Sequence, residues 1–297
     1  MELLLTVIIL NHNRAKEVLA VYEDLKNQTF QNFNILVLDD NSDSEDFKLL
    51  KAITEEKFLL FSYITPYKFG FDLKWNYALK KALLQNPKFI YFIHNDMKIN
   101  NVDLLEKLVN KINGDDFCGA VGPSIYDVNG VRIWGPGIVK ERMGKKYILN
   151  ETYMVRSKCY TEMGLINEKL IYYGNEYFTF NWLRDNGYTT INLSDVSVTH
   201  FGGGVSLAFQ NAKDYYRPRT TILIMKLFCR SDSFLRKVRY FYEELSEPRI
   251  KMVKYLRSFQ FISFFKSLFI VIAGTIAGLI IPIKIYKKKL QFSSSIK

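Results

Sequence analysis

The chain has 297 residues, of which 48% are hydrophobic and 24% are charged. This composition predicts an ordered protein of one large or two modest domains, and it excludes a disordered tail protein, a collagen-like repeat and a disulfide-stapled scaffold. Its formal net charge is +11, but residues 248–297 hold ten basic residues and no acidic one, so residues 1–247 carry only +1. Three widely spaced cysteines without a C-x-x-C pair argue for a reducing compartment and against a structural zinc site.

Strands and helices alternate in the first half of the chain. Apolar runs predict strands at residues 3–10, 34–38, 58–62 and 88–93. Helices are predicted at residues 15–26, after Ser44, from Phe71 to about Asn86, and at residues 102–112. Such alternation is typical of right-handed βαβ units, so we expect an α/β fold with a mostly parallel sheet flanked by helices.

Polar residues cluster directly after three of these strands. The clusters are Asn11-His12-Asn13-Arg14, Asp39-Asp40-Asn41-Ser42 and His94-Asn95-Asp96. Ligands of open α/β sheets bind outside the carboxyl ends of the strands, so the three clusters predict one site. The sequence has neither a G-x-G-x-x-G motif nor a P-loop motif, which disfavours the ordinary dinucleotide and P-loop modes of binding.

Each candidate residue also has a structural interpretation. Asp39 could bind a ribose or base, or belong to a turn and helix cap, and Asp96 could ligate a hard cation or cap a helix. His200 precedes three glycines that would let the backbone approach a ligand, although a lone histidine is usually structural. Glu176 lies in the first turn of a predicted helix, where the helix dipole favours its ionised form. It could be an acid–base residue or a surface glutamate that stabilises the helix.

The C-terminal segment is apolar and basic. Residues 267–283 are uncharged, and aromatic residues from position 259 onward bring the stretch to the length of about 20 residues that a membrane span needs. A spanning helix, an interfacial or re-entrant helix and a buried core helix are all compatible with this pattern. Gly274 and Gly278 form a G-x-x-x-G spacing that could pack two helices closely.

Because the cations surround an apolar run, they suit anionic lipid headgroups better than nucleic acid. Residues 3–10 lack the basic region and cleavage site of a signal peptide. We therefore expect a membrane-associated or single-pass protein at the cytoplasmic face of the cell membrane, with no nucleic-acid partner.

Taken in order, the clusters resemble inverting family 2 glycosyltransferases with the GT-A fold, particularly the rhamnosyltransferase-like branch, over about residues 5–204. T-V-I-I-L-N-H-N-R at residues 6–14 resembles the opening strand and loop of that family. Q-T-F-Q-N-F at 28–33 and V-L-D-D-N-S at 37–42 match its next motifs. F-G-F at 69–71 with Asn76, G-A-V-G-P at 119–123 and I-W-G-P-G at 133–137 follow in family order.

This resemblance implies roles for particular residues. The nucleotide sugar would be bound by Asn11, Asn13, Arg14, Asp39, Asn41, Gly70, Asn76, Asn95 and Asp96. Glu176 in Gly174-Asn175-Glu176 falls at the position of the catalytic base, which is the Asp of G-E-D in the family. Asp96 and His200 would hold Mg²⁺ or Mn²⁺, although Asn95-Asp96-Met97 lacks the last carboxylate of the family's D-x-D or N-D-D motif. Trp134, Tyr172 and Gly174 would lie on the acceptor side, where the two aromatic rings could stack on sugars or simply pack.

The resemblance also implies the reaction and the domain organisation. A hexosyl or deoxyhexosyl group would pass from a nucleotide sugar to a hydroxyl of a lipid-linked glycan or glycolipid, in polysaccharide biosynthesis or protein glycosylation. We expect a GT-A domain at residues 1–208, a helical basic connector at 209–257 and a membrane-associated segment at 258–297. Two alternatives stay open: a polyprenyl-phosphate glycosyltransferase, and a non-catalytic, membrane-anchored binder of nucleotides or sugars.

Overall fold

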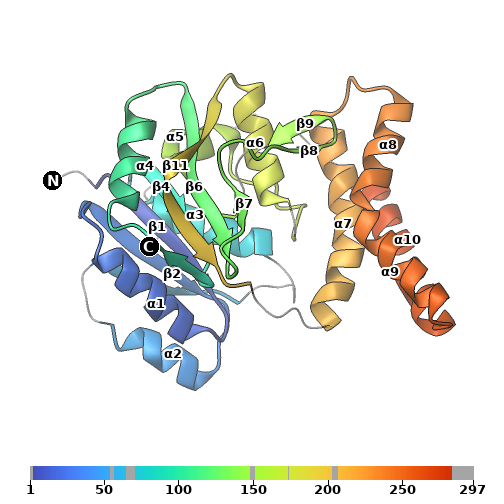
Figure 1. The fold of residues 1–297 in the computed structure, drawn as a ribbon, viewed down its shortest axis with the longest axis horizontal. Helices are drawn as coiled ribbons and strands as arrows, with labels where there is room; N and C mark the ends of the chain where they lie inside the picture. Colours follow the sequence, from blue (N-terminus) through green and yellow to red (C-terminus); the bar gives the residue numbers. More distant parts are fainter. Residues whose placement is uncertain are drawn as a thin grey trace.

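A computed structural model describes residues 3–53, 57–64, 71–147, 151–172, 174–202 and 207–282. A sheet lies between helices, and a group of C-terminal helices stands at one side of the molecule (Figure 1). Within the described residues, most strands belong to one mixed sheet and two short strands form a separate pair. The α/β sheet expected from the sequence is therefore present.

The strands of the first half agree closely with the prediction. All strands of the described residues are, in chain order, β1 Leu5–Asn11, β2 Phe33–Asp39, β3 Phe58–Ser62, β4 Phe89–Phe92, β5 Met97–Ile99, β6 Cys118–Asp127, β7 Arg132–Trp134, β8 Lys140–Arg142, β9 Lys145–Tyr147, β10 Tyr153–Arg156 and β11 Thr189–His200. In the main sheet they lie in the order β3-β2-β1-β4-β10-β6-β11-β5, with β7 paired to β6, while β8 and β9 form a separate pair. Strands β1 to β4 pair in parallel, whereas β10 runs antiparallel between β4 and β6. The sheet is parallel at one side and mixed at the other.

The helices are α1 Ala15–Lys26, α2 Ser44–Lys51, α3 Phe71–Leu83, α4 Leu104–Asn113, α5 Ser157–Met163, α6 Asn175–Asp185, α7 Leu207–Phe228, α8 Phe234–Glu244, α9 Ser246–Arg257 and α10 Phe261–Ile280. Helix α2 begins after Asp43, whose side chain accepts a hydrogen bond from the backbone N–H of Asp46. The residue that caps α2 is therefore Asp43, and the cap interpretation does not account for Asp39.

Two hydrophobic clusters cover the two faces of the sheet. Val7 and Ile9 of β1 pack with α1 and α4 on one face, while Ile8 packs with α3, α5, α6 and α7 on the other. Side chains alternate between the faces of a strand, so β1 is buried on both sides, as is typical of strands in a covered parallel sheet. Helix α7 thus belongs to the core of the molecule.

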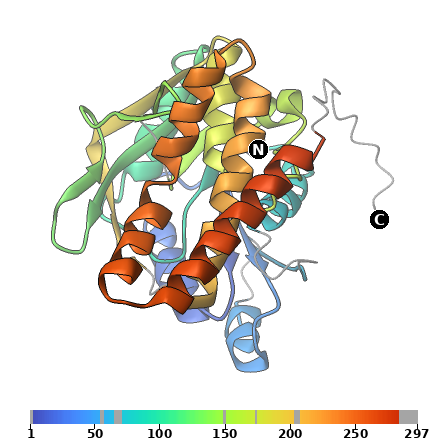
Figure 2. The ribbon, with the colours of Figure 1, turned by 90° about the vertical axis from the view of Figure 1, so that its right-hand side faces the viewer.

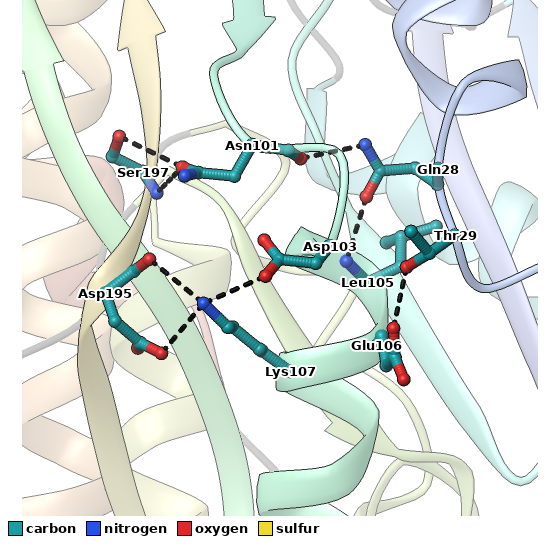
Figure 3. A network of polar contacts seen from close by, with 9 residues as sticks. All are labelled: Gln28, Thr29, Asn101, Asp103, Leu105, Glu106, Lys107, Asp195 and Ser197. Atoms are coloured by element: carbon teal, nitrogen blue, oxygen red, sulfur yellow. Dashed lines mark hydrogen bonds and ion pairs between the residues drawn. The ribbon is translucent and has the colours of Figure 1, made fainter.

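The Q-T segment that supported the family resemblance has a structural role. Gln28 follows the C-terminal end of α1, donates to the carbonyl of Asn101 and accepts from the backbone N–H of Leu105 (Figure 3). Asn101 in turn accepts from the backbone of Ser197 in β11. Lys107 bridges Asp103 and Asp195 nearby. This network joins α1, α4 and β11 at the end of α1 that lies away from the polar clusters.

Candidate functional site

The carboxyl ends of β1 and β2 carry a hydrogen-bonded network. Asn11 and Asp39 are partners in the strand register, and both are 2% exposed. Nδ2 of Asn11 lies 2.9 Å from Oδ1 of Asp39 and 2.9 Å from Oδ2 of Asp46. The Ser42 hydroxyl and backbone N–H both donate to Asp39. Asp39 and Asn11 therefore support each other at the base of the predicted site.

Asn13 and Asn41 lie in the loops that leave these two strands. Their φ angles of 54° and 53° place both in the left-handed region, which asparagine tolerates better than most residues. The Asn13 amide oxygen accepts from the backbone N–H of Asp43, which ties the two loops together. Next to them, Asp40 forms an ion pair with Lys74 of α3. The loops predicted to surround a nucleotide are thus held in a defined conformation.

A second cluster forms where β4 ends and β11 ends. Nε2 of His200 lies 3.3 Å from Oδ2 of Asp96, and Nδ1 of His200 lies 3.2 Å from Oε2 of Glu151. Arg14 approaches the same Asp96 oxygen at 3.9 Å. The structure therefore brings together Arg14, Asp96 and His200, as the sequence predicted, and adds Glu151.

The charges of this cluster reinforce one another. Hydrogen bonds to Asp96 and Glu151 raise the pKa of His200 to about 10. Burial alone would raise the pKa of Asp96, but the hydrogen bond from His200 and the nearby positive charges outweigh it and lower that pKa. Burial lowers the pKa of His94, the second histidine near this cluster. At neutral pH the cluster contains an imidazolium between two carboxylates.

The side chains of this cluster offer few ligands to a divalent cation. Both ring nitrogens of His200 face carboxylate oxygens, and a doubly protonated imidazole has no lone pair for a metal ion. In this arrangement His200 is therefore a hydrogen-bond partner of Asp96. To ligate a metal, as the sequence predicted, the ring would have to be neutral. Among the described residues, no group of three or more His, Cys, Asp or Glu side chains could hold a metal ion. Oδ1 of Asp96 has no hydrogen-bond or ion-pair partner in the described segments. One carboxylate fits Mg²⁺ or Mn²⁺ when substrate phosphates and water supply the other ligands.

Glu176 lies in the first turn of α6, and we call its surroundings, with Gly174 and Asp72, the Glu176 corner. Gly174, the residue before α6, has a φ of 152°, and a Cβ there would lie 2.7 Å from Cγ2 of Thr220. Only glycine allows the chain to pass this close to α7 and then turn into α6. Position 174 therefore requires glycine so that the backbone can reach the helix that carries Glu176.

Asp72 lies beside Glu176 and is fully buried, and the backbone N–H of Asn175 approaches its carboxylate. Burial and then the negative charge of Glu176 raise the pKa of Asp72 well above its ordinary value of 3.8. The neighbouring Phe71 stacks on His94, with ring centroids 6.1 Å apart. The start of α3 thus connects the Glu176 corner with the cluster around Asp96.

Other predicted site residues have structural partners. Asn76 is 2% exposed, and its amide is bonded to both backbone groups of Ile166. Trp134 and Tyr172 are 5% and 6% exposed, which favours the packing alternative over stacking on sugars. Asn95 is partly exposed in the turn after β4, and Gly70 lies outside the described residues.

A cavity of about 540 Å³ opens between α3, the segment before α6 and the end of α10. Its polar lining includes Lys80, Lys169 and Arg219, and its apolar wall includes Ile281 and Pro282. Tyr63 and Tyr77, stacked at 4.5 Å, line it as well. The backbone N–H of Tyr63 donates to the carbonyl of Asp39, so the cavity reaches the edge of the sheet that carries the polar clusters.

No sequence pattern pointed to Glu151 or to Asp72. Glu151 lies in the segment before β10, where no strand end or motif marks it. Asp72 lies in the first turn of a helix, a common place for a surface acidic residue. Both are recognised only from what the folded chain places around them.

Comparisons with known proteins identify the family and the fold. The family described as "Glycosyl transferase family 2" matches residues 6–173. A search of curated proteins found no match. In solved structures, the fold is similar to that of S. aureus TarS 1–349 in complex with UDP-GlcNAc, with 20% identity, a TM-score of 0.61, and 82% of this chain and 71% of that chain covered.

A second similar structure is the mannosyltransferase PcManGT from Pyrobaculum calidifontis in complex with GDP-Man and Mn²⁺. Its identity is 15% and its TM-score 0.57, and 93% of this chain and 87% of that chain are covered. At these identities the two structures establish the fold.

Proposed function

Because this chain belongs to glycosyl transferase family 2, we propose that it moves a sugar from a nucleotide-sugar donor to a hydroxyl of a lipid-linked glycan or glycolipid at the cytoplasmic face of a membrane. One observation carries the proposal. Glu176 stands at the start of α6, and α3 connects its corner to the charged cluster of Arg14, Asp96 and His200. A single displacement needs both parts, a base for the acceptor and groups that stabilise the negative charge of the leaving group.

The donor would bind at the carboxyl ends of β1, β2 and β4. Asn13, Asn41 and Asn95 present partly or fully exposed side chains there. Asn11 and Asp39 would shape the base of this site through the network that joins them. The position of Asn76, with its amide bonded to Ile166, supports a role in holding α3 in place.

In the transfer step, the carboxylate of Glu176 would accept the proton of the acceptor hydroxyl as its oxygen attacks the anomeric carbon. The bond from that carbon to the diphosphate oxygen breaks as the new bond forms, with inversion of configuration. Arg14 and protonated His200 would stabilise the negative charge that develops on the departing nucleoside diphosphate. A divalent cation held by Asp96 would supply further charge neutralisation, and the hydrogen bond from His200 would orient that carboxylate.

The cavity beside α10 supports a second candidate, a polyprenyl-phosphate glycosyltransferase. Lys80, Lys169 and Arg219 line this cavity together with a single acidic residue, Glu168. Its net positive lining and the apolar wall at Ile281 and Pro282 suit a phosphate joined to a lipid chain. A lipid phosphate is already ionised and acts as nucleophile without a base, so this reaction would not need Glu176.

The sugar is also a proposal. The order of motifs suggests a hexose or deoxyhexose of the rhamnosyl type, and the donors seen in the similar structures, UDP-GlcNAc and GDP-Man, extend the set to be tested. Donor hydrolysis and transfer by the purified protein should be measured across such nucleotide sugars with Mn²⁺, with Mg²⁺ and with EDTA.

Glu176→Gln tests the base. We expect kcat to fall by about 10²–10⁴-fold, because the amide cannot accept the proton. Glu176→Asp, which restores the residue type of the family motif, should retain part of the activity. Glu45→Gln is the matched control, since Glu45 is 82% exposed and pairs with Lys48 on the surface of α2.

Nucleotide binding, followed by a thermal shift, should persist in Glu176→Gln and show that the variant is folded. Transfer to a lipid phosphate that survives in this variant would favour the second candidate. If the unaltered protein binds the nucleotide tightly but shows no turnover with membrane extract as acceptor, the chain is a non-catalytic binder and the proposed function is wrong.

A further inference from the structure

Helix α10 is the one helix, within the segments that the structure describes, that is long and apolar enough to cross a membrane. One face of it is already occupied. Ser267, Val271, Gly274 and Gly278 are its buried residues, and their spacing of four, three and four places them on a single stripe. A Cβ at Gly274 would collide with the carbonyl oxygen of Tyr215, and one at Gly278 would lie 2.9 Å from that of Arg219. The G-x-x-x-G spacing therefore packs α10 directly against α7.

Helix α7 carries charged side chains on the surfaces that contact α9 and α10. Asp214 and Arg217 are 6% and 5% exposed and form ion pairs with Lys251 and Glu247 of α9. Lys226 donates to the carbonyls of Gly278, Leu279 and Ile281, and so satisfies the free carbonyl groups at the end of α10. If α10 crossed a bilayer in this arrangement, α7 would carry these charges into the hydrocarbon at a high cost.

The opposite face of α10 is exposed and almost wholly apolar. Its members are Phe261, Ile262, Phe265, Phe269, Ile272, Ile276, Leu279 and Ile280. Steps of three and four residues again place them on one side of the helix, away from α7. Two neighbouring helices add exposed apolar residues: Phe234, Leu235, Val238 and Tyr242 in α8, and Ile250, Val253 and Leu256 in α9. We call these fifteen residues the apolar platform.

Helices α8, α9 and α10 lie over α7 on the side of the molecule away from the sheet (Figures 1 and 2). Basic side chains of α9 lie next to the apolar platform. A groove of about 500 Å³ on α9 is lined by Arg249, Lys254 and Arg257 together with Ile250 and Val253. Apolar side chains next to basic ones match the layering of a membrane surface, in which anionic headgroups cover the acyl chains.

We propose that the apolar platform binds the surface of an anionic membrane with α10 lying in the plane of the interface, so that the chain attaches to one leaflet without crossing the bilayer. An interfacial helix buries its apolar face about 5–10 Å into the boundary between headgroups and acyl chains. In this orientation α7 stays in water on the protein side, and the basic residues of α9 meet lipid phosphates.

The geometry joins this surface to the proposed base. Thr220 of α7 contacts Gly174 and donates to the carbonyl of Tyr172, while Arg219 on the neighbouring side faces Gly278 of α10. A single helix therefore separates the platform from the turn that leads to Glu176, and packed helix axes lie about 8–10 Å apart. This inference extends the membrane location in the proposed function, but binding to vesicles tests it without any measurement of activity.

The experiment uses the full chain and vesicles of phosphatidylcholine with or without phosphatidylglycerol. We expect the protein to float with vesicles that contain phosphatidylglycerol and to bind neutral vesicles more weakly. Phe265→Ser with Phe269→Ser should reduce vesicle affinity at least about tenfold, because burial of each phenylalanine drives binding. Phe117→Ser, at a residue 73% exposed and remote from the platform, is the matched control and should bind as the unaltered chain does.

Orientation is measured with single tryptophan substitutions at Phe261, Phe269 and Ile276 and with lipids that carry a quencher at different depths. An in-plane helix places all three at the same shallow depth, so shallow quenchers should act on them equally. Strongest quenching at Phe269 by a quencher near the bilayer centre would show a spanning helix and overturn the proposal. A doubled molecular mass in solution without vesicle binding would also overturn it, because the platform would then join two copies of the chain.

Discussion

Asp72 is a fully buried acid whose carboxylate is approached by the backbone N–H of Asn175, and it lies beside the proposed base. Folding keeps it protonated over a range of pH in which the unfolded chain ionises it. The side chain therefore lowers the free energy of unfolding as the pH rises from its ordinary pKa of 3.8 toward the raised pKa of the folded state. Below that range it has no such effect. Glu176, Arg219 and the backbone N–H of Asn175 are the groups that face it.

We predict that Asp72→Asn stabilises the protein more at pH 8 than at pH 5. Asparagine is close in shape to the protonated acid and cannot ionise, so the pH-dependent loss of stability should disappear. Thermal unfolding of both proteins across this range, with an increase in Tm of several degrees at the higher pH, is the measurement. Equal changes in Tm at both pH values would show that Asp72 has an ordinary pKa in the folded protein.

At the level of residues, the ends of the predicted strands marked polar residues that the structure brings close together, and their role in binding stays a prediction. Asp39 and Asp96 follow strands, and polar residues at the carboxyl ends of parallel strands share one edge of the sheet. Glu151 was missed because it comes close to Asp96 only through the pairing of β10 with β4 and the position of His200 at the end of β11. Contacts across such distances in sequence leave no local pattern.

At the level of elements, the first half of the chain was predicted well because its strands are continuous apolar runs and its helices carry periodic apolar faces. The short strands β7, β8 and β9 have three residues each, too few to show a period of two. Helix α7 begins two residues before the start of the expected connector and contributes Leu223 and Ile224 to the core. Its mixture of charged and apolar residues reflects contacts with the core, α9 and α10 together.

The close packing of α10 on α7 leads to a prediction for Gly274→Ala. The new Cβ has no room beside the carbonyl oxygen of Tyr215, so α10 must move away or its end must separate from α7. We expect a loss of about 1–3 kcal/mol in the free energy of unfolding, as for other overpacked contacts, and faster proteolysis within α10.

Gly114→Ala is the matched control for this substitution. Gly114 ends α4 with a φ of −78°, which any residue adopts, and the nearest neighbour of a Cβ there is 3.2 Å away. Its stability should change little. If Gly274→Ala is equally neutral, α10 does not pack on α7 in solution, and the in-plane arrangement loses its main support.

At the level of the whole molecule, the exposed apolar residues of the C-terminal helices and the polar clusters of the sheet lie in different parts of the structure. The C-terminal helices and α7 stand at one side of the molecule, while β1 and β2 lie toward the other (Figure 1). The sequence indicated this polarity through its basic, apolar C-terminal segment. It could not distinguish a spanning helix from an in-plane one, because that depends on which face of α10 is covered by α7.

The polarity yields a prediction for the choice of acceptor. A protein held at the membrane surface meets an embedded acceptor at a high effective concentration, whereas a water-soluble acceptor gains nothing from the attachment. We therefore expect Phe265→Ser with Phe269→Ser to lower transfer to a vesicle-embedded, long-chain acceptor by about ten- to a hundredfold and to leave transfer to a short-chain, soluble analogue unchanged. The two rates, measured side by side in one preparation, check this. An equal loss with both acceptors would mean that these phenylalanines act on the fold or the active site, and attachment in the membrane plane would then not be what delivers the acceptor to Glu176.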